Sequence, residues 1–391
     1  MLKNCTQSRN SRPEGHLSAV DTGPALLQEG CSCSMQKYRT VHGVLNTVIA
    51  IPTLNEADHI GSVISSLSEP GYDGKVPQIW IIDGLSADGT AEIVRGLGLP
   101  HVTVIDNPAR TQAHAINLAA LHAQNVGDVD VLIRADAHAH YPEGFVARII
   151  ATMIETGAES IVVPLETIGG SRLQDAAAIL FRTWLGTGGS PHRTGSMRGF
   201  VEHGHHAAFL LDDFIALGGY DTDFLANEDA EFDYRLTQSG RRIFLENNIA
   251  IQYIPRLSLM ATFRQYKRNG TYRIRRAVKH NIGLGLRQAI PALLLPILLL
   301  GALLGISVSP VFWIIPLGYF SAILAAALQI ARKANHVRLT ILIAALAAAS
   351  HLGFSVGASL EFLRCRFSSA RRRLLLNDKA RLMAVPDRNE S

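Results

Sequence analysis

From Leu45 onward, short apolar runs alternate with stretches that have helical periodicity. The apolar runs, which predict strands, are Leu45–Pro52, Gln78–Asp83, Val102–Ile105, Asp130–Arg134 and Ser160–Pro164. The helical stretches between them are Ala57–Leu67, Ala87–Leu97, Thr111–Ala123 and Glu143–Thr156. Alternation at this spacing is typical of a parallel sheet with right-handed crossovers. The pattern therefore predicts an α/β domain whose mostly parallel sheet is flanked by helices.

Two segments lack this regularity. Residues 1–43 are polar and aperiodic, without the apolar stretch of a secretory signal, and we expect a disordered extension. The segment Leu185–Gly199 is rich in glycine. It predicts a mobile loop near the site, although a plain surface connection has the same composition.

Helical periodicity returns at Asp229–Gln238, where Phe232 and Leu236 share the predicted buried face. We expect Asn227 to cap this helix. The acidic side chains between the apolar positions, Glu231 and Asp233, are predicted to face solvent.

Two long segments near the C-terminus contain no Asp, Glu, Lys or Arg: Gln288–Ala331 and Leu339–Leu360. A membrane-spanning helix needs about 20 apolar residues, so the first segment has room for two helices and the second for one. The predicted organisation is an extension at 1–43, an α/β domain at 44–260, a basic amphipathic segment at 261–287, a membrane region at 288–361 and a basic tail at 362–391.

The net charge of +4 is modest, but basic residues are concentrated just before the first apolar segment. They are Arg264, Lys267, Arg268, Arg273, Arg275, Arg276, Lys279 and Arg287. Basic residues beside a span mark the cytoplasmic side and attract anionic lipid headgroups. Because no aromatic stacking platform or recognition motif accompanies them, we expect no nucleic-acid partner.

The charges create a conflict about topology. A hairpin that turns near Ser307–Pro310 returns the basic loop at 332–338 to the cytoplasmic side. A third crossing would then export a tail that contains Arg364, Arg366 and Arg371–Arg373. Either this tail violates the positive-inside tendency, or one apolar segment enters the membrane without crossing it.

Acidic residues lie at the ends of two apolar runs and at the start of the last predicted helix of the α/β domain. Asp83 lies in IWIIDGLSADGT, Asp136 in VDVLIRADAHA, and Glu228 and Asp229 in LANEDAEFDYRL. Ligands of parallel sheets gather at the carboxyl ends of the strands, so these side chains are expected to meet at one crevice. Carboxylates there suit a metal-bound, phosphate-rich substrate and a general base.

Structural roles compete with functional ones at some of these acidic positions. Turn and helix capping explains Ser86–Asp88, whereas Asp83, before the turn, is better explained as an acceptor for a base or ribose. Asp136 and His138 would share one side of a continued strand and could bind Mn²⁺, while Mg²⁺ prefers oxygen ligands alone. Carboxylates in a first helical turn are stabilised by the helix dipole, which competes with a catalytic role for Asp229.

Other chemistry has weaker support. No P-loop, dinucleotide-binding or nucleophile-elbow motif occurs. Three histidines, His203, His205 and His206, could line a pocket or bind metal, but without a defined acidic partner they are interpreted as packing and hydrogen-bonding residues. The four cysteines form neither an even disulfide framework nor a metal-binding spacing, so a reducing compartment fits best.

Taken together, the motifs resemble those of the family 2 glycosyltransferases with a GT-A fold. The resemblance covers about Thr47–Arg276 and rests on IPTLNEADHI, IIDGLSADGT, RADAHAH, GGYDTDFLANEDAEFDYRL and RQYKRNG in this order. The stretch GFVEHGHHAAFLLDDFIALGGYD and the apolar C-terminal region are similar to the ExoA-type glucosyltransferases of succinoglycan biosynthesis.

The resemblance implies roles for particular residues. Nucleotide-sugar contacts fall on Pro52, Thr53, Glu56, Asp83 and Asp136. Asp136, with His138 where a second Asp is usual, would hold a divalent cation, Mn²⁺ or Mg²⁺. Asp229 would be the catalytic base, and acceptor or diphosphate contacts fall on Glu228, Gln265 and Arg268. Asn269 replaces the Trp of the processive members, which argues against a polymerising synthase.

These expectations define a membrane-anchored inverting transferase. It would move a hexose, glucose by resemblance, from a UDP-sugar to a hydroxyl of a polyprenyl-diphosphate-linked oligosaccharide in exopolysaccharide biosynthesis. The enzyme would be a multi-pass protein of the inner membrane with its catalytic domain in the cytoplasm, working beside other exopolysaccharide-assembly proteins. One alternative is a polyprenyl-phosphate glycosyltransferase, similar to dolichyl-phosphate mannose synthases. The other is a non-catalytic scaffold that binds nucleotide sugars.

Overall fold

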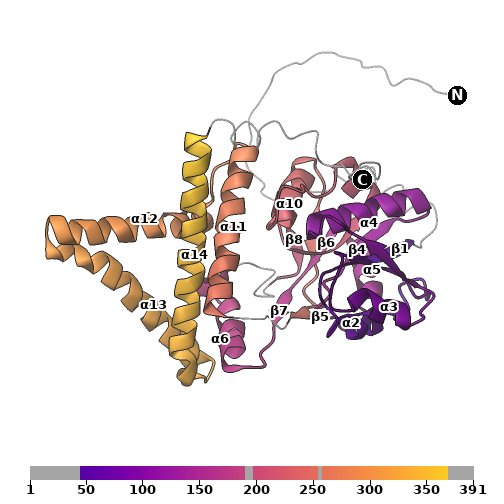
Figure 1. Cartoon of the computed structure of the whole chain (residues 1–391), viewed down its shortest axis with the longest axis horizontal. Coiled ribbons are helices and arrows are strands. Elements are labelled where there is room, and N and C mark those ends of the chain that lie inside the picture. Colours follow the sequence, from indigo (N-terminus) through magenta and orange to yellow (C-terminus); the bar gives the residue numbers. More distant parts are fainter. Residues whose placement is uncertain (1–44, 190–196, 254–257, 369–391) are drawn as a thin grey trace, which may run out of the picture. The chain divides into compact units, whose positions relative to one another are not determined.

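The computed structural model describes residues 45–189, 197–253 and 258–368 (Figure 1). The predicted N-terminal extension lies outside these residues, as does the tail beyond residue 368. Of the predicted loop Leu185–Gly199, residues 190–196 also lie outside them. Its first residues are helical and not a loop, because Trp184–Thr187 forms the short helix α7.

Two sheets form the α/β domain. The order of the larger sheet is β3-β2-β1-β4-β9-β6-β10-β8, and that of the smaller is β5-β11-β7. The strands are β1 (Thr47–Thr53), β2 (Gln78–Asp83), β3 (Val102–Asp106), β4 (Val131–Arg134), β5 (Ala139–His140), β6 (Ser160–Val163), β7 (Leu165–Thr167), β8 (Gly199–Val201), β9 (His205–Leu210), β10 (Ile243–Leu245) and β11 (Ile251–Tyr253). All five predicted strands form, and β1–β4 are parallel as expected. Strand β9 lies antiparallel between β4 and β6, so the larger sheet is mixed.

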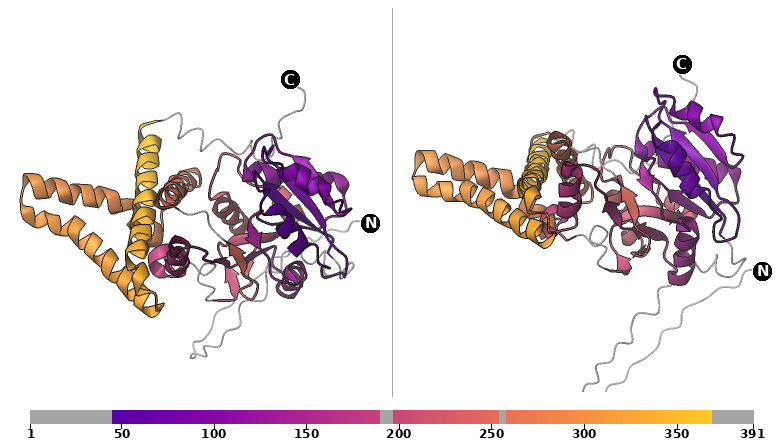
Figure 2. Two further views of the ribbon diagram at one scale, coloured as in Figure 1. Left: turned by 60° about the horizontal axis from the view of Figure 1, so that its bottom comes forward. Right: turned by 90° about the horizontal axis from the view of Figure 1, so that it is seen from below.

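Helices cover both faces of the larger sheet (Figure 2). They are α2 (Ile60–Leu67), α3 (Thr90–Gly96), α4 (Gln112–Val126), α5 (Phe145–Thr156), α9 (Leu211–Ala216) and α10 (Glu228–Gln238). Helix α6 (Arg172–Phe181) packs instead with the C-terminal helices. Alternate residues of β1 enter different cores. Ile49 and Ile51 pack with α2 and α5, whereas Val48 and Ala50 pack with α4 and α10. A strand buried on both faces has a continuous apolar sequence, which explains the runs seen in the chain.

The remaining helices are α11 (Leu259–Lys279), α12 (Leu286–Ser307), α13 (Ile314–Lys333) and α14 (Thr340–Phe367), with 3₁₀ turns at Pro310–Trp313 and Val337–Leu339. Helices α12 and α13 are joined at one end and both reach α14 at the other (Figures 1 and 2). In the part of the chain that the structure describes, three segments are long and apolar enough to cross a membrane: Leu286–Ser307, Pro310–Lys333 and Val337–Phe367.

One hydroxyl joins α12 to α14. Pro296 has no N–H and therefore leaves the carbonyl of Ala292 without its helical donor. The Ser355 hydroxyl donates to this oxygen at 3.0 Å and accepts from the N–H of Leu295 at 2.8 Å. The proline inside α12 is thus compensated by a side chain of α14.

Candidate active site

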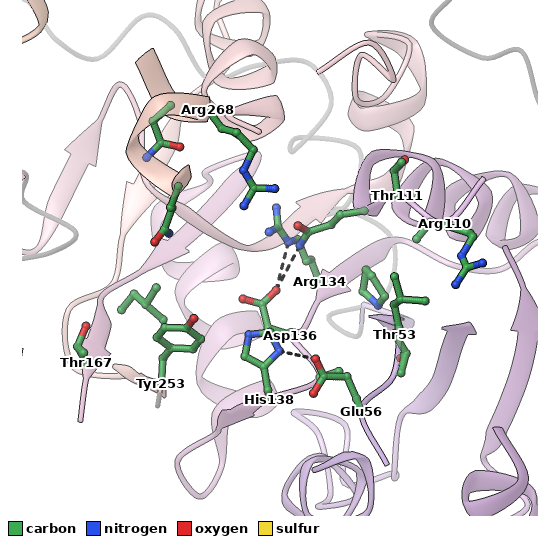
Figure 3. Close-up of a pocket in the computed structure, with 18 of the residues that line it drawn as sticks. Thr53, Glu56, Arg110, Thr111, Arg134, Asp136, His138, Thr167, Tyr253 and Arg268 are labelled. Atoms are coloured by element: carbon green, nitrogen blue, oxygen red, sulfur yellow. Dashed lines mark hydrogen bonds and ion pairs between the residues drawn. The ribbon is translucent and has the colours of Figure 1, made fainter. Parts of the chain in front are cut away.

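A cavity of about 480 Å³ opens at the carboxyl ends of β1 and β4 (Figure 3). We call one side the strand-end wall, made of Pro52, Thr53, Glu56, Arg134, Asp136 and His138. The opposite side, the helical wall, comes from α11 and consists of Gln265, Tyr266, Arg268 and Asn269. Seven of the site residues predicted from the sequence line this cavity: Pro52, Thr53, Glu56, Asp136, His138, Gln265 and Arg268.

Asp136 is held as an anion by Arg134 and His205. Its Oδ1 lies 3.7 Å from Nε of Arg134, and its Oδ2 lies 3.3 Å from Nε2 of His205. Burial alone would raise the pKa of this carboxyl, but the hydrogen bond and charge of His205, together with Arg134, hold the pKa well below its usual range. A permanently ionised carboxylate is suited to a metal ion and not to proton transfer near neutral pH.

Arg134 connects Asp136 with the acidic start of α10. Its Nη1 lies 3.6 Å from Oε1 of Glu228, although the guanidinium is only 5% exposed. A buried charge of this kind is tolerated because carboxylates surround it, and they raise the pKa of Arg134 despite its burial. The predicted convergence of Asp136 with Glu228 therefore occurs through an arginine that we did not single out from the sequence.

The two acids at the start of α10 have different environments. Glu228 is buried, and desolvation together with the charge of Asp229 raises its pKa to about 7 against the opposing effect of Arg134. Asp229 is only half-buried, and its Oδ1 accepts a hydrogen bond from the N–H of Ala230 at 2.7 Å. Neither residue is part of the described cavity lining.

Asn227 is the N-cap residue of α10, as predicted, but it does not cap the helix through its side chain. Asn227 occupies the capping position in a left-handed conformation, with φ of 57°, but its side chain makes no capping hydrogen bond. Its amide instead donates to the carbonyl of Asn269 at 3.1 Å. The side chain thus connects the start of α10 to the helical wall, a contact that local sequence cannot show.

Asp83 lies beside the cavity but not on its lining. The register of β1 and β2 pairs Asp83 with Thr53, which does line the cavity. Asp83 is buried, and its two oxygens accept hydrogen bonds from the N–H and hydroxyl of Ser86 at 2.9 and 2.6 Å. In this structure the carboxylate shapes the turn after β2.

The prediction that Glu231 and Asp233 face solvent is wrong, since both are fully buried. Glu231 lies 3.0 Å from the ammonium of Lys279 and 2.9 Å from Nε2 of His280, and it also pairs with Arg235. Burial opposes ionisation, but these partners lower the pKa of Glu231 well below its usual range. Helix α11 therefore docks onto α10 through buried charges, which a pattern of apolar positions does not reveal.

Two histidines that were interpreted as packing residues have acidic partners in space. His205 binds Asp136, and Nδ1 of His203 lies 2.5 Å from Oδ2 of Asp233. The interpretation of these histidines as hydrogen-bonding residues is confirmed for both. The importance of His205 for Asp136 was missed, because antiparallel β9 brings it to the site from a distant part of the chain.

Among the described residues, no three His, Cys, Asp or Glu side chains form a group that could hold a metal ion by themselves. Asp136 and His138 nevertheless line the same cavity, and Nδ1 of His138 lies 3.1 Å from Oε1 of Glu56 (Figure 3). The second oxygen of Glu56 is buried without a hydrogen-bond partner in the described structure. This incomplete set fits a cation whose remaining ligands are phosphate oxygens of a substrate.

The fold and the cavity agree with comparisons to known proteins. The family model described as "Glycosyl transferase family 2" matches residues 48–218. The chain is 42% identical over 281 residues to "Succinoglycan biosynthesis protein ExoA" of Rhizobium meliloti (strain 1021), an alignment that covers 71% of this chain and 83% of that protein. The chain therefore belongs to the family 2 glycosyltransferases and is of the ExoA type.

Two further similarities are more distant. A "Dolichyl N-acetyl-alpha-D-glucosaminyl phosphate 3-beta-D-2,3-diacetamido-2,3-dideoxy-beta-D-glucuronosyltransferase" of Methanococcus voltae is 26% identical over 231 residues, or 56% of this chain and 69% of that protein. Among solved structures, the mannosyltransferase PcManGT from Pyrobaculum calidifontis, in complex with GDP-Man and Mn²⁺, has a TM-score of 0.53 at 16% identity, covering 81% of this chain and 92% of that one. The GT-A-like fold and the assignment as a glycosyltransferase are thus confirmed.

Proposed function

We propose that this enzyme transfers a hexose, glucose in our proposal, from a UDP-sugar to a hydroxyl of a polyprenyl-diphosphate-linked oligosaccharide, with inversion at the anomeric carbon. The observation that carries the proposal is the link from Asp136 through Arg134 to Glu228, the neighbour of Asp229 in the chain, with Asp136 and Arg134 lining one cavity. The similarity to a succinoglycan biosynthesis protein supports a role in exopolysaccharide assembly, alongside other assembly proteins.

The donor binds along the strand-end wall in this proposal. Pro52, Thr53 and Glu56 contact the nucleotide. Asp83, which is paired with Thr53 on the neighbouring strand, orders the adjoining turn. Asp136 and His138 hold a divalent cation, which when bound neutralises the charge of the departing diphosphate. A mixed oxygen and nitrogen set favours Mn²⁺ over Mg²⁺.

Asp229 is the general base that takes the proton from the acceptor hydroxyl. It is the more accessible of the two acids at the start of α10, whereas Glu228 is buried behind Arg134. Glu228 keeps Arg134 in place near the diphosphate. Its carboxyl group also contributes to the electrostatic potential at Asp229. A base on the helix α10 can approach the sugar from the side opposite the leaving diphosphate, which inversion requires.

The acceptor binds along the helical wall. Gln265 and Arg268 are exposed on α11 and offer an amide and a guanidinium for saccharide hydroxyls and phosphate oxygens. The rings of Phe181 and Tyr266, which also line the cavity, are stacked with centroids 6.0 Å apart and planes 24° apart. Flat apolar faces of this kind suit the C–H face of a hexose.

The test is product formation with defined substrates in the full-length enzyme. UDP-glucose, UDP-galactose and GDP-mannose are each offered with a synthetic polyprenyl-diphosphate sugar and, separately, with polyprenyl phosphate. We expect transfer from UDP-glucose to the diphosphate-linked sugar only, with inverted configuration in the product. Transfer to polyprenyl phosphate would instead favour the polyprenyl-phosphate glycosyltransferase, and UDP binding without any product would favour a scaffold.

A further inference from the structure

The three apolar C-terminal helices differ in how far protein covers them. In the most hydrophobic part of each, 17% of the residues of α12 and 11% of those around α13 are buried, compared with 39% for α14. Large apolar side chains such as Leu299, Ile306 and Ile314 are 61%, 76% and 70% exposed. Most of the unpartnered apolar surface therefore belongs to α12 and α13, whereas on α14 the most exposed apolar side chains, Ile341 and Phe367, lie at the two ends.

Helices α6, α7 and α11 cover α14 along most of its length. At its N-terminal half, Ile343 and Ala347 share a core with Ala177 and Leu180 of α6. In the middle, Nε2 of His351 lies 2.9 Å from the carbonyl oxygen of Leu185, just after α6.

At its C-terminal half, α14 packs on α11 with the two backbones in contact. A Cβ at Gly353 would lie 2.5 Å from the carbonyl oxygen of Phe263, and one at Gly357 would overlap the carbonyl oxygen of Lys267. One turn further, the fully buried Glu361 lies 2.9 Å from Nε of Arg275. At 1.5 Å per residue, the covered stretch from residue 343 to 361 is about 27 Å long, close to the thickness of a hydrocarbon core.

A helix bound so closely to α11 cannot enter the hydrocarbon alone. On α11, Arg264, Lys267 and Arg268 are exposed, and Arg268 also lines the cavity. Charged side chains in the membrane centre are costly and are normally placed toward water or a partner. If α14 crossed the bilayer, it would carry this charged helix and one wall of the active site with it.

Helices α12 and α13, by contrast, have the properties of a membrane hairpin. No charged residue lies between Gln288 and Ala331. Near the turn, a Cβ at Gly301 would lie 2.8 Å from Ile315, and one at Gly305 would lie 2.9 Å from Trp313, so small residues allow the two segments to pack closely. Their 22 and 20 residues are each long enough to span.

We infer that the lipid bilayer is the partner of the exposed surface of α12 and α13, which cross as a hairpin, and that α14 does not cross. Helix α14 instead lies at the membrane surface, bound to α6, α7 and α11. The end of α14, with Arg364 and Arg366, then lies on the same side as the catalytic domain. This arrangement removes the conflict with the positive-inside tendency, and it does not depend on which sugar is transferred.

The test is labelling of single cysteines with a membrane-impermeant maleimide in sealed vesicles of both orientations. The parent carries Cys5, Cys31 and Cys33 replaced by Ser and keeps Cys365, which is buried and serves as the unlabelled control. The three exposed reporter positions are Ser239→Cys in the catalytic domain, Ser307→Cys at the hairpin turn and Arg366→Cys near the end of α14. Turnover of each variant shows that it is folded, and Ser368→Cys replaces Arg366→Cys if the latter does not accumulate.

We expect Ser239→Cys and Arg366→Cys to react in the same vesicle orientation and Ser307→Cys in the opposite one, each with at least about tenfold preference. Reaction of Arg366→Cys together with Ser307→Cys would mean that α14 crosses, and would overturn the inference. Failure of Ser307→Cys to react from the far side would equally overturn it, because the hairpin would then not cross.

Discussion

The strand-end wall and the helical wall of the cavity are positioned by different interactions. On the strand-end wall, backbone hydrogen bonds between neighbouring strands hold the residues, such as Ala135 N–H to Ala50 O at 3.0 Å and Gly84 N–H to Thr53 O at 2.8 Å. In the part of the chain that the structure describes, no such ladder joins the helical wall to the sheet. Buried ion pairs to α10 and the close packing against α14 hold α11 in place.

This difference has a consequence for how each wall responds to change. A ladder shares its free energy among many backbone groups, so no single side chain decides its geometry. Removing one partner of a buried ion pair strongly destabilises the fold, because the other charge remains buried without compensation. We therefore expect single substitutions behind the helical wall to weaken acceptor binding while donor binding is retained.

The largest expected effect is on the catalytic rate and leaves the structure of both walls unchanged. Asp229→Asn removes the proposed base and should lower kcat by about 10²–10⁴-fold, the usual contribution of general-base catalysis. UDP affinity, measured by calorimetry, should stay close to that of the wild type, since the strand-end wall is untouched. Asp212→Asn, an exposed acid in the first turn of α9, is the matched control for the loss of a helix-terminal charge. Wild-type turnover in Asp229→Asn would contradict the assignment of the base.

The second effect concerns the buried charges behind the helical wall. Glu231→Gln removes the carboxylate that pairs with His280 and Arg235, while Lys279 keeps its second partner Asp221. The change should lower the free energy of unfolding by about 3 kcal/mol. The acceptor KM should rise severalfold while UDP affinity is unchanged. Glu92→Gln is the control, because Glu92 is 73% exposed and its ion pair with Arg95 should contribute less than about 1 kcal/mol. Equal stability of the two variants would show that buried charge does not hold α11.

The smallest effect tests the contact between α11 and α14. Gly357→Ala places a methyl group against the carbonyl oxygen of Lys267, so the helices must separate, at a cost of about 1–3 kcal/mol in the free energy of unfolding. Gly318→Ala in α13, where no atom lies within 4 Å, should be neutral or stabilising by up to about 1 kcal/mol. Thermal unfolding in detergent compares the two. If Gly357→Ala were as stable as Gly318→Ala, the close approach of the helices would be unnecessary.

Periodicity and chain order were enough to predict the α/β domain. The apolar runs at β1, β2, β4 and β6 are strands because both faces of the sheet are buried, and such burial leaves a direct record in the sequence. The edge strand β3 is only partly buried. Placement at a strand end predicted Asp136, and the family resemblance predicted Pro52 and Thr53, and all three line one cavity. These predictions depend on local pattern and on the geometry common to parallel sheets.

Only the tertiary structure showed what surrounds the acidic residues. Arg134 and His205 are supplied to Asp136 by β4 and antiparallel β9, and Glu231 is buried because α11 brings Lys279 and His280 to it. Likewise, composition makes α12, α13 and α14 all apolar enough for a membrane, whereas the extensive contact of α14 with α11 distinguishes it from the other two. The physical reason is the same in each case. The cost of burying a charge or exposing an apolar face depends on partners distant in the chain, and no local pattern records them.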